Sequence, residues 1–316
     1  MSPTIVAEGL RKRFGDKTAL DGLDLTVEAG AVHGVLGPNG AGKTTAVRIL
    51  TTLLKLDDGH AEVAGFDVMT RADQVRAHIG LVGQNAAVDE VLSARQNLEL
   101  FGRLYHLNAK DARARATELL EKFDLADTGN KAVKQFSGGM RRRLDLAASL
   151  ILRPRVLFLD EPTTGLDPRG RNEVWEAVRA LVREGTTVLL TTQYLDEADQ
   201  LAGAISVVDH GRVIASGSPA TLKSRLGGDR IEVVLHDLSA LPDAAEVVSR
   251  IAGAPAETDP DNRQVSAPVT DPLAALGDAV RALREAGLAV EDVALRRPTL
   301  DEVFLHLTGV KKEVHA

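Results

Sequence analysis

Cysteine is absent from the 316-residue sequence, aromatic residues make up only 3% of it, and no apolar run is as long as a membrane span. The lack of cysteine excludes disulfide bonds, thiolate metal sites and cysteine nucleophiles. So few aromatic side chains argue against a platform on which nucleic-acid bases stack. The charged start MSPTIVAEGLRKRFGDK lacks the apolar stretch of a signal peptide. We therefore expect a globular protein that stays in the cytoplasm.

Most of the net negative charge lies in the last third of the chain. Residues 225–316 contain 10 Lys and Arg against 16 Asp and Glu, whereas residues 1–224 contain 28 against 29. Non-specific binding to DNA or anionic lipid needs a basic surface, which this balance does not provide. The change in charge also suggests a domain boundary near Gly227-Gly228-Asp229, where glycines predict a flexible break. We expect two domains, at 1–227 and 228–316.

The second domain is predicted to be a small α+β domain. Its hydrophobic periodicity alternates between that of strands and that of helices. The expected order is strand 230–236, helix 243–252, strand 254–258, strand 263–269, helix 272–286 and strand 289–296. This β-α-β-β-α-β order is the ferredoxin-like arrangement. A last amphipathic segment is either part of the core or a surface for a partner, and its apolar face is formed by Leu300, Val303, Phe304 and Leu307.

The first domain is predicted to be an α/β domain. Short apolar runs at 32–36, 156–159 and 187–190 are each bounded by Gly, Pro or Asp, and helical stretches lie between them. Such runs fit strands that are covered on both faces, as in a mostly parallel sheet. Residues 85–150 contain no convincing strand and are predicted to form an inserted helical subdomain.

A glycine loop, Gly37-Pro38-Asn39-Gly40-Ala41-Gly42-Lys43-Thr44, follows the first of these apolar runs and precedes a helical stretch. It matches G-x-x-x-x-G-K-[ST] in the order of strand, loop and helix that phosphate binding requires. The backbone N–H groups and the helix N-terminus attract phosphate oxygens, Lys43 neutralises the terminal phosphates and Thr44 can ligate Mg²⁺. A simple glycine-rich turn is the alternative, but a chance match is rare, on the order of one in a hundred chains of this length. We assign nucleotide binding to this loop and to Thr45.

Two carboxylates, Asp160 and Glu161, end the apolar run at 156–159. In a parallel sheet the carboxyl end of this strand would lie beside the glycine loop. Asp160 would then hold Mg²⁺ directly or through water, and Glu161 would orient or deprotonate an attacking water. Alone, such a strand end is more often only solvated. Together with the glycine loop, it indicates nucleotide hydrolysis.

A second anion-binding nest is predicted at Ser137-Gly138-Gly139, at the start of a helical run. Taken alone, this pattern is as readily a capped helix. Two phosphate-binding devices are more than one nucleotide needs. We therefore expect two chains to pair head to tail, each lending its Ser137 nest to the γ-phosphate held on the Lys43 loop of the other. The following run, Arg141-Arg142-Arg143, is interpreted as a solvated or subunit-facing helix surface without a catalytic role.

In this order, the motifs resemble those of the nucleotide-binding subunits of ABC transporters. The glycine loop resembles the Walker A motif, residues 156–161 resemble Walker B, and Phe136-Ser137-Gly138-Gly139-Met140 resembles the signature motif LSGGQ. The resemblance implies ATP hydrolysis at two sites buried between two subunits, with ATP and Mg²⁺ as cofactors.

Four single residues receive a role from this resemblance. It implies that Phe14 stacks on adenine, that Gln84 reaches Mg²⁺ or the attacking water and senses a membrane partner, and that Asp167 belongs to the D-loop beside the nucleotide. Gln193 stands where the family keeps its switch histidine. An amide can donate a hydrogen bond to the γ-phosphate but cannot carry the charge of an imidazolium, so we expect slower or differently gated hydrolysis rather than none.

Residues outside the ATPase motifs indicate a branch of the family. TTQYLDEADQLA at 191–202, GFDV at 65–68 and PTLDEVFL at 298–305 resemble the daunorubicin-resistance type of ATP-binding subunit. That branch implies an ATPase at the cytoplasmic face of the membrane, which powers export of a drug or natural product through a separate membrane subunit and carries an acidic regulatory C-terminal domain.

Three alternatives remain open at this point. Exporters of lipids or polysaccharides are organised similarly. A soluble ABC-type ATPase acting on ribosomes or DNA is disfavoured because the chain has one cassette and an acidic tail, and we expect no nucleic-acid partner. A non-enzymatic nucleotide sensor would be expected to lack Lys43 or Glu161, and both are present.

Overall fold

The computed structural model describes residues 3–84, 86–224, 229–296, 299–300 and 302–304. The chain divides into two compact units, Met1–Ser218 and Pro219–Ala316. The division precedes the short helix α8 (Pro219–Ser224), whereas the sequence suggested a boundary at 227–228. The glycines on which that expectation depended lie outside the described residues.

An antiparallel sheet, which was not expected from the sequence, forms one layer of the first unit. Its strands follow the order β2-β1-β4-β5. They are β1 (Pro3–Phe14), β2 (Lys17–Glu28), β4 (Asp58–Val63) and β5 (Phe66–Asp67). Strands β1 and β2 form a hairpin in which Phe14 pairs with Lys17, and Gly15 adopts the left-handed backbone conformation that this tight turn requires.

The central sheet has the strand order β10-β9-β3-β8-β7-β6. The strands are β3 (Val32–Leu36), β6 (Ile79–Val82), β7 (Val156–Asp160), β8 (Thr187–Thr192), β9 (Ala204–Asp209) and β10 (Arg212–Gly217). All neighbouring strands are parallel except β9 and β10. Every residue of β3, β7 and β8 is buried. The predicted sheet of strands covered on both faces is thus confirmed.

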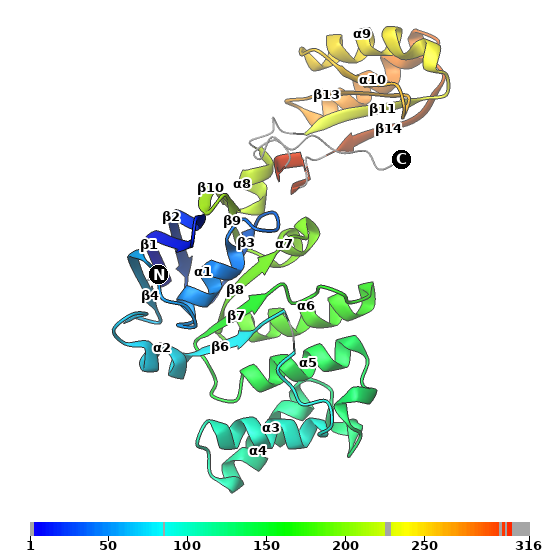
Figure 1. Ribbon diagram of the computed structural model, residues 1–316. Coiled ribbons are helices and arrows are strands. Elements are labelled where there is room, and N and C mark those ends of the chain that lie inside the picture. The colour runs from blue at the N-terminus through cyan, green and yellow to red at the C-terminus, as the bar shows by residue number, and fades with distance from the viewer. Residues whose placement is uncertain (1–2, 85, 225–228, 297–298, 301, 305–316) are drawn as a thin grey trace. The chain divides into compact units, whose positions relative to one another are not determined.

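Helix α1 (Lys43–Leu50) lies between the two sheets (Figure 1). Its residues Val47 and Leu50 share one apolar core with Ile5 of the antiparallel sheet and Phe158 of the central sheet. Helices α6 (Pro168–Arg183) and α7 (Leu195–Leu201) cover the opposite face of the central sheet. Helix α2 (Ala72–His78) leads into β6. The glycine loop therefore starts from a strand and ends in a helix that are both fixed by the core.

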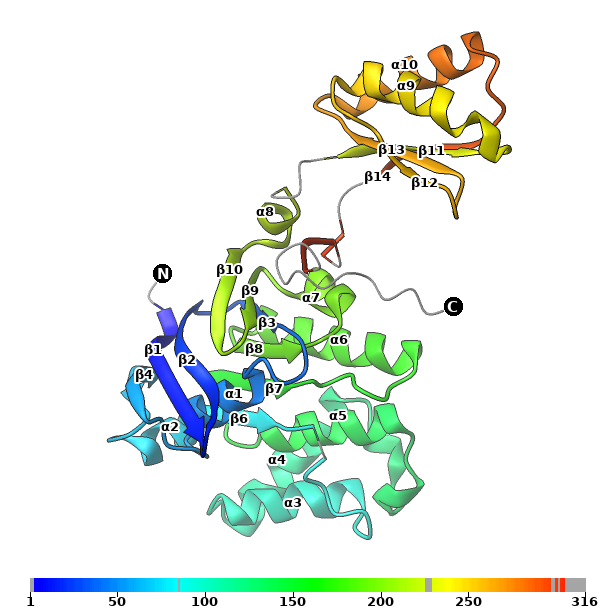
Figure 2. The same ribbon diagram turned by 45° about the horizontal axis from the view of Figure 1, so that its top comes forward.

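A helical insertion lies at one end of the first unit (Figure 2). It contains α3 (Ala94–Leu104), α4 (Ala109–Lys122), two short 3₁₀ turns (Ala126–Thr128 and Val133–Gln135) and α5 (Gly138–Ser149). Ser93 starts α3 with a capping box, in which Ser93 and Gln96 satisfy each other's backbone N–H groups. The described residues from 86 to 150 form no strand, which confirms the predicted inserted helical subdomain.

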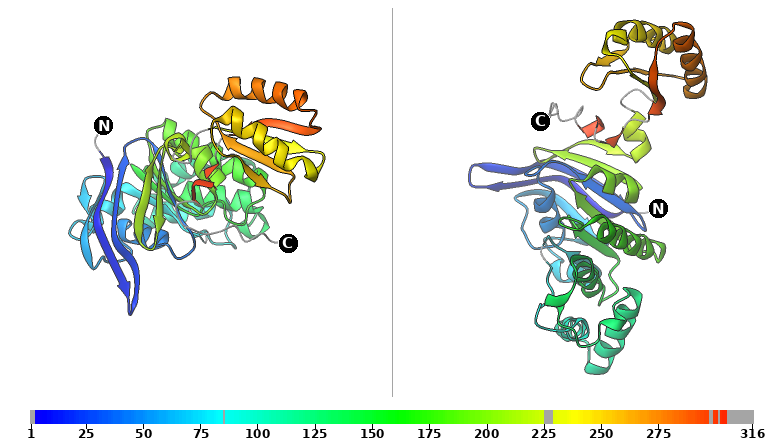
Figure 3. Two further views of the ribbon diagram at one scale, coloured as in Figure 1. Left: turned by 90° about the horizontal axis from the view of Figure 1, so that it is seen from above. Right: turned by 90° about the vertical axis from the view of Figure 1, so that its right-hand side faces the viewer.

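The second unit has the predicted ferredoxin-like topology. Its elements are β11 (Arg230–Leu235), α9 (Leu241–Ala252), β12 (Glu257–Asp259), β13 (Gln264–Pro268), α10 (Pro272–Glu285) and β14 (Val290–Arg296). The sheet order is β12-β13-β11-β14, and all pairs are antiparallel. Both helices lie on one face of the sheet (Figure 3). There they bury Ile231, Val233 and Leu235 of β11.

The last described residues begin a helix. Thr299 and Glu302 form reciprocal bonds: the Thr299 hydroxyl accepts from the N–H of Glu302, and the Glu302 carboxylate accepts from the N–H of Thr299. Leu300 and Val303 are buried, which agrees with the core alternative for this apolar face. Leu307 of the same expected face lies outside the described residues.

Candidate active site

The carboxyl ends of four parallel strands meet at one edge of the central sheet. Leu36 at the end of β3 pairs with Thr192 at the end of β8, Asp160 at the end of β7 pairs with Thr191, and Val82 at the end of β6 pairs with Leu159. This register brings the glycine loop, the two carboxylates, the segment after β6 and the segment after β8 to the same edge. The placement fits the rule that ligands of open α/β sheets bind at this edge.

The glycine loop approaches neighbouring backbone so closely that two of its glycines are required. A Cβ atom on Gly37 would lie 2.3 Å from the carbonyl oxygen of Val208, and one on Gly42 would lie 2.6 Å from that of Ala19. Gly42 is also the N-cap of α1, with φ 108°, and offers no side chain to the first N–H groups of the helix. These N–H groups can bind phosphate oxygens.

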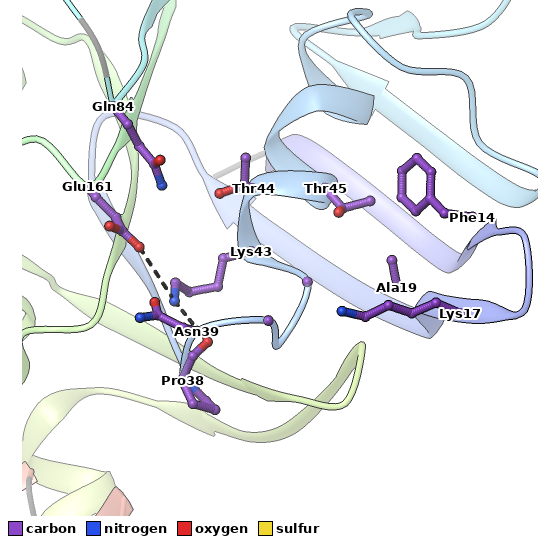
Figure 4. Close-up of a pocket in the computed structure, with 12 residues that line it drawn as sticks. Phe14, Lys17, Ala19, Pro38, Asn39, Lys43, Thr44, Thr45, Gln84 and Glu161 are labelled. Carbon is purple, nitrogen blue, oxygen red and sulfur yellow. Dashed lines mark hydrogen bonds and ion pairs between the residues drawn. The ribbon is translucent and has the colours of Figure 1, made fainter.

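Lys43 follows Gly42 as the first residue of α1, and its side chain is only 4% exposed. Its Nζ donates to the carbonyl oxygens of Gly37 (2.7 Å) and Pro38 (3.1 Å), and it lies 3.8 Å from Oε1 of Glu161 (Figure 4). Burial lowers the pKa of Lys43, while the carboxylates of Glu161 and Asp160 oppose that shift. The Lys43 ammonium group thus contacts both the glycine loop and the Glu161 carboxylate.

Asp160 and Thr44 provide adjacent oxygen atoms at the strand end. The Thr44 hydroxyl donates to Asp160 Oδ1 over 3.3 Å, and the Thr191 hydroxyl donates to the same oxygen over 2.5 Å. A hydroxyl and a carboxylate are the hard oxygen ligands that Mg²⁺ prefers, and nucleotide phosphates would complete its shell. The donor set therefore fits Mg²⁺, although the described residues contain no cluster of three or more His, Cys, Asp and Glu that could hold a metal ion without such phosphates.

Glu161 turns away from the strand direction immediately after Asp160. Its φ is 51°, a left-handed conformation that costs a non-glycine residue about 1–3 kcal/mol. Its N–H donates to the backbone oxygen of Thr191 (3.1 Å) and to the Thr191 hydroxyl (3.2 Å). These bonds to β8 hold the turn, and the Glu161 side chain lines the pocket that also contains Lys43.

The pocket has a volume of about 290 Å³ and opens along the antiparallel sheet. Its far end is formed by Phe14, which is 50% exposed, and by Lys17 and Ala19 of β2. Gln84 reaches it from the segment after β6 (Figure 4). The full lining is Phe14, Lys17, Ala19, Pro38, Asn39, Gly40, Gly42, Lys43, Thr44, Thr45, Gln84 and Glu161.

The predicted site residues of the other motifs are absent from this lining, as far as the structure describes it. The Ser137 hydroxyl accepts from the N–H of Met140 (3.2 Å) at the start of α5. Asp167 caps α6 in the same way, with Gly170 as donor (2.8 Å). Gly138 and Gly139 form the first turn of α5, and the half-buried Gln193 follows β8. Within one chain, Ser137 therefore acts as the N-cap of α5, as the helix-cap alternative expects.

Two residues of the site region were not predicted from the sequence to be where the structure places them. Lys17 adds a cation to the pocket, and its only signal was its proximity to Phe14 across a two-residue turn. Arg142 was interpreted as surface, which is wrong, because only 7% of it is exposed. Its guanidinium binds the backbone oxygens of Gly83 and Pro162, each over 2.7 Å. The carbonyl groups of these two loops make a buried position possible for an arginine.

Comparisons with known proteins fit this geometry. A family model described as ABC transporter matches residues 20–164, and one described as ATP-binding protein DrrA1-3-like, C-terminal domain, matches residues 217–308. The chain is 67% identical to the daunorubicin resistance ATP-binding protein DrrA3 of Streptomyces coeruleorubidus, over 98% of this chain and 97% of that protein. It is 51% identical to the daunorubicin/doxorubicin resistance ATP-binding protein DrrA of Streptomyces peucetius, over 96% and 92%.

More distant likenesses are of the same kind. The chain is 40% identical to the Nod factor export ATP-binding protein I of Ralstonia nicotianae, over 98% of this chain and 94% of that protein. Among solved structures, the ADP conformation of an ATP-binding cassette of an ABC transporter aligns with a TM-score of 0.63 and 25% identity, over 69% of this chain and 92% of that one. A dimeric cassette bound to ADP and phosphate shares the fold, with a TM-score of 0.61, 24% identity, and coverage of 68% of this chain and 98% of that one.

Proposed function

The chain belongs to the ATP-hydrolysing subunits of ABC transporters, in the daunorubicin-resistance branch, and from this premise we propose that it powers export of an amphipathic drug or natural product through a separate membrane subunit. The observation that carries the proposal is one pocket that joins the glycine loop, Lys43 and Glu161. The relatives named for daunorubicin resistance support the class of cargo.

Hydrolysis would use the residues of this pocket, and Asp160 in contact with Thr44, in separate roles. The loop N–H groups and Lys43 would hold the β- and γ-phosphates of ATP, and Phe14 would stack on adenine. Thr44, Asp160 and Gln84 would hold Mg²⁺, and the ion would supply positive charge against the phosphate oxygens. Glu161 would orient and deprotonate the attacking water. A bound γ-phosphate would compete with Glu161 for the Lys43 ammonium, which frees the carboxylate to act on water.

The second half of each site would come from another copy of the chain. Ser137, Gly138 and Gly139 form an anion-binding helix N-terminus that does not line the pocket of its own chain. In a head-to-tail dimer this nest would face the γ-phosphate held by the other copy, with Asp167 beside it. Gln193 follows β8 at the sheet edge that carries the glycine loop, and it would donate a neutral hydrogen bond to the γ-phosphate held by its own chain. Related cassettes include one solved as a dimer.

The transport pathway would be formed by an integral-membrane permease, with this chain docked at the cytoplasmic face of the membrane. No helix among the described residues is long and apolar enough to cross a bilayer. The second unit, 228–316 by the sequence boundary, would regulate or assemble the complex and perform no chemistry. A second candidate is export of a lipid or polysaccharide, which the relatives named for Nod factor export favour.

Transport in membrane vesicles tests this proposal. We would co-express the chain with a candidate permease, prepare inverted vesicles and measure daunorubicin uptake with and without ATP and Mg²⁺. Lys43→Ala should abolish ATP-dependent uptake because it removes the charge that faces the phosphates. Lys110→Ala, an exposed lysine on α4, is the matched control and should behave as wild type. ATP-dependent uptake of a lipid-linked product but not of daunorubicin would support the second candidate instead.

A further inference from the structure

A buried ion pair on α5 connects two loops of the active site. Arg142 and Asp145 stand one helical turn apart, and 7% and 4% of their surfaces are exposed. Arg142 Nη1 donates to Asp145 Oδ2 over 3.3 Å. Neither side chain contributes to the lining of the nucleotide pocket, so any role that they have in hydrolysis must be exerted through other residues.

The contacts of this pair bracket Gln84. Arg142 Nη1 also donates to the backbone oxygen of Gly83 (2.7 Å), and Asp145 Oδ1 accepts from the N–H of Ala87 (2.9 Å). Gly83 immediately precedes Gln84, and Ala87 follows it closely. The two ends of the glutamine-bearing segment are therefore fixed to the same turn of α5.

A third contact reaches the segment that follows Glu161. Arg142 Nε donates to the backbone oxygen of Pro162 (2.7 Å), and Pro162 immediately follows Glu161. The planar guanidinium can make these bonds in fixed directions, whereas the single ammonium of a lysine cannot reproduce both. Arg142 thus contacts both the segment of Gln84 and the segment of Glu161.

Stability alone does not account for such a pair. A buried ion pair contributes little net stability compared with apolar residues of similar volume. Burial raises the pKa of Asp145, opposed by its bond from Ala87 and by the charge of Arg142. Arg142 Nη2 is also buried without a hydrogen-bond partner among the described residues, which adds a further cost.

We propose that Arg142 and Asp145 are positioning residues that set Gln84 and Glu161 relative to each other, so that a movement of α5 is transmitted to both. The inference rests on the roles proposed above for these two residues. Ser137 caps the N-terminus of the same helix. The pair would therefore connect the nest that faces the other copy to Glu161 and Gln84 of its own site.

The experiment compares neighbouring arginines of one helix. Arg142→Lys keeps the charge but cannot make both loop contacts. Arg143→Lys is the matched control, because Arg143 contacts the backbone oxygen of Phe123 and the Glu173 carboxylate of α6 instead of the two active-site segments. For the full-length chain we would measure the Kd of a non-hydrolysable ATP analogue, kcat and KM for ATP, and hydrogen exchange of peptides that cover 83–87 and 161–163.

Arg142→Lys should leave the Kd unchanged, because the glycine loop and Lys43 are untouched. It should lower kcat by on the order of 10- to 100-fold, since a misplacement of about 1 Å can cost that much, and both peptides should exchange faster. Arg143→Lys should match wild type in kcat and in these peptides. Should Arg142→Lys not fold, Asp145→Asn takes its place, because it keeps an oxygen for Ala87 but removes the charge beside Arg142.

The outcomes distinguish this inference from the proposed function. Wild-type kcat and wild-type exchange in Arg142→Lys would overturn the positioning role and leave the ATPase assignment intact. Equal losses of affinity and kcat in both arginine variants would also overturn it, since they would indicate general destabilisation. If the wild-type chain hydrolysed no ATP, the proposed function would fail, and exchange of the two peptides would still decide whether the pair holds the loops.

Discussion

The buried histidine of β3 makes the stability of the first unit depend on pH. His33 is 6% exposed, and its Nε2 lies 2.9 Å from the hydroxyl of Ser206 on β9. Burial lowers the pKa of His33 from 6.5 to about 4. Because β3 leads directly into the glycine loop, loss of its folding also removes the phosphate site.

The sign and size of the effect follow from proton linkage. Below about pH 6.5 the unfolded chain binds a proton at this histidine, whereas the folded chain does not until about pH 4, so acidification between these values favours unfolding. The loss is about 2 kcal/mol between pH 7.5 and pH 5, and about 3 kcal/mol once the pH is below 4. Burial raises the pKa of Asp145 and Glu197, and groups of that kind change stability in the opposite direction.

A comparison with His33→Gln isolates the histidine, because glutamine does not titrate and the other groups are common to both proteins. We would follow denaturant unfolding by fluorescence of Trp175, the single tryptophan, which reports on the unit that contains His33. The stability difference between wild type and variant should change by about 2 kcal/mol between pH 7.5 and pH 5. Equal losses of stability in the two proteins would refute a neutral buried histidine.

Three further predictions concern the partner copy, the switch position and the second unit. Mixing Lys43→Ala chains with Ser137→Arg chains should restore ATPase activity that neither has alone, because the mixed dimer contains one intact composite site; no recovery would contradict action in trans. Gln193→His should introduce a titrating step in turnover near pH 6.5 that wild type lacks; a pH profile identical to that of wild type would remove this residue from the γ-phosphate. Ile231→Ala should lower the unfolding free energy of the second unit by roughly 2–5 kcal/mol while the Kd for ATP stays unchanged, as calorimetry and equilibrium dialysis can measure.

The chemistry of the pocket was predictable because it demands certain residue types in a fixed order. The glycines at 37 and 42 have no room for a side chain, and a strand that ends in Asp160 and Glu161 can meet them only in a parallel sheet. The far end of the pocket was not predictable. Lys17 reaches it only because β1 and β2 form an antiparallel hairpin, and no motif in the sequence indicates this hairpin.

The interior position of Arg142 was not predictable either. A run of three arginines on a helix gives no sign of which one faces inward, and the partners of Arg142 include backbone oxygens of distant loops. The topology of the second unit was easier to predict, because apolar and polar residues alternate along its strands and its helices are amphipathic. One strand was nevertheless placed too early, at 254–258 instead of Glu257–Asp259. The N–H of Ala256 donates to the Ser249 hydroxyl of α9 (2.9 Å), which ties the preceding residues to the helix.

Hydrolysis and dimerisation of Glu161→Gln test the central claim most directly. Phosphate release and the mass of the ATP-bound species would be measured on the same sample by a coupled assay and light scattering. The amide keeps the shape of the side chain but cannot accept the proton of the attacking water. We predict that the variant binds ATP with wild-type affinity, releases no phosphate in steady state and accumulates as an ATP-bound dimer. Phosphate release at the wild-type rate would contradict the assignment of Glu161 as the base.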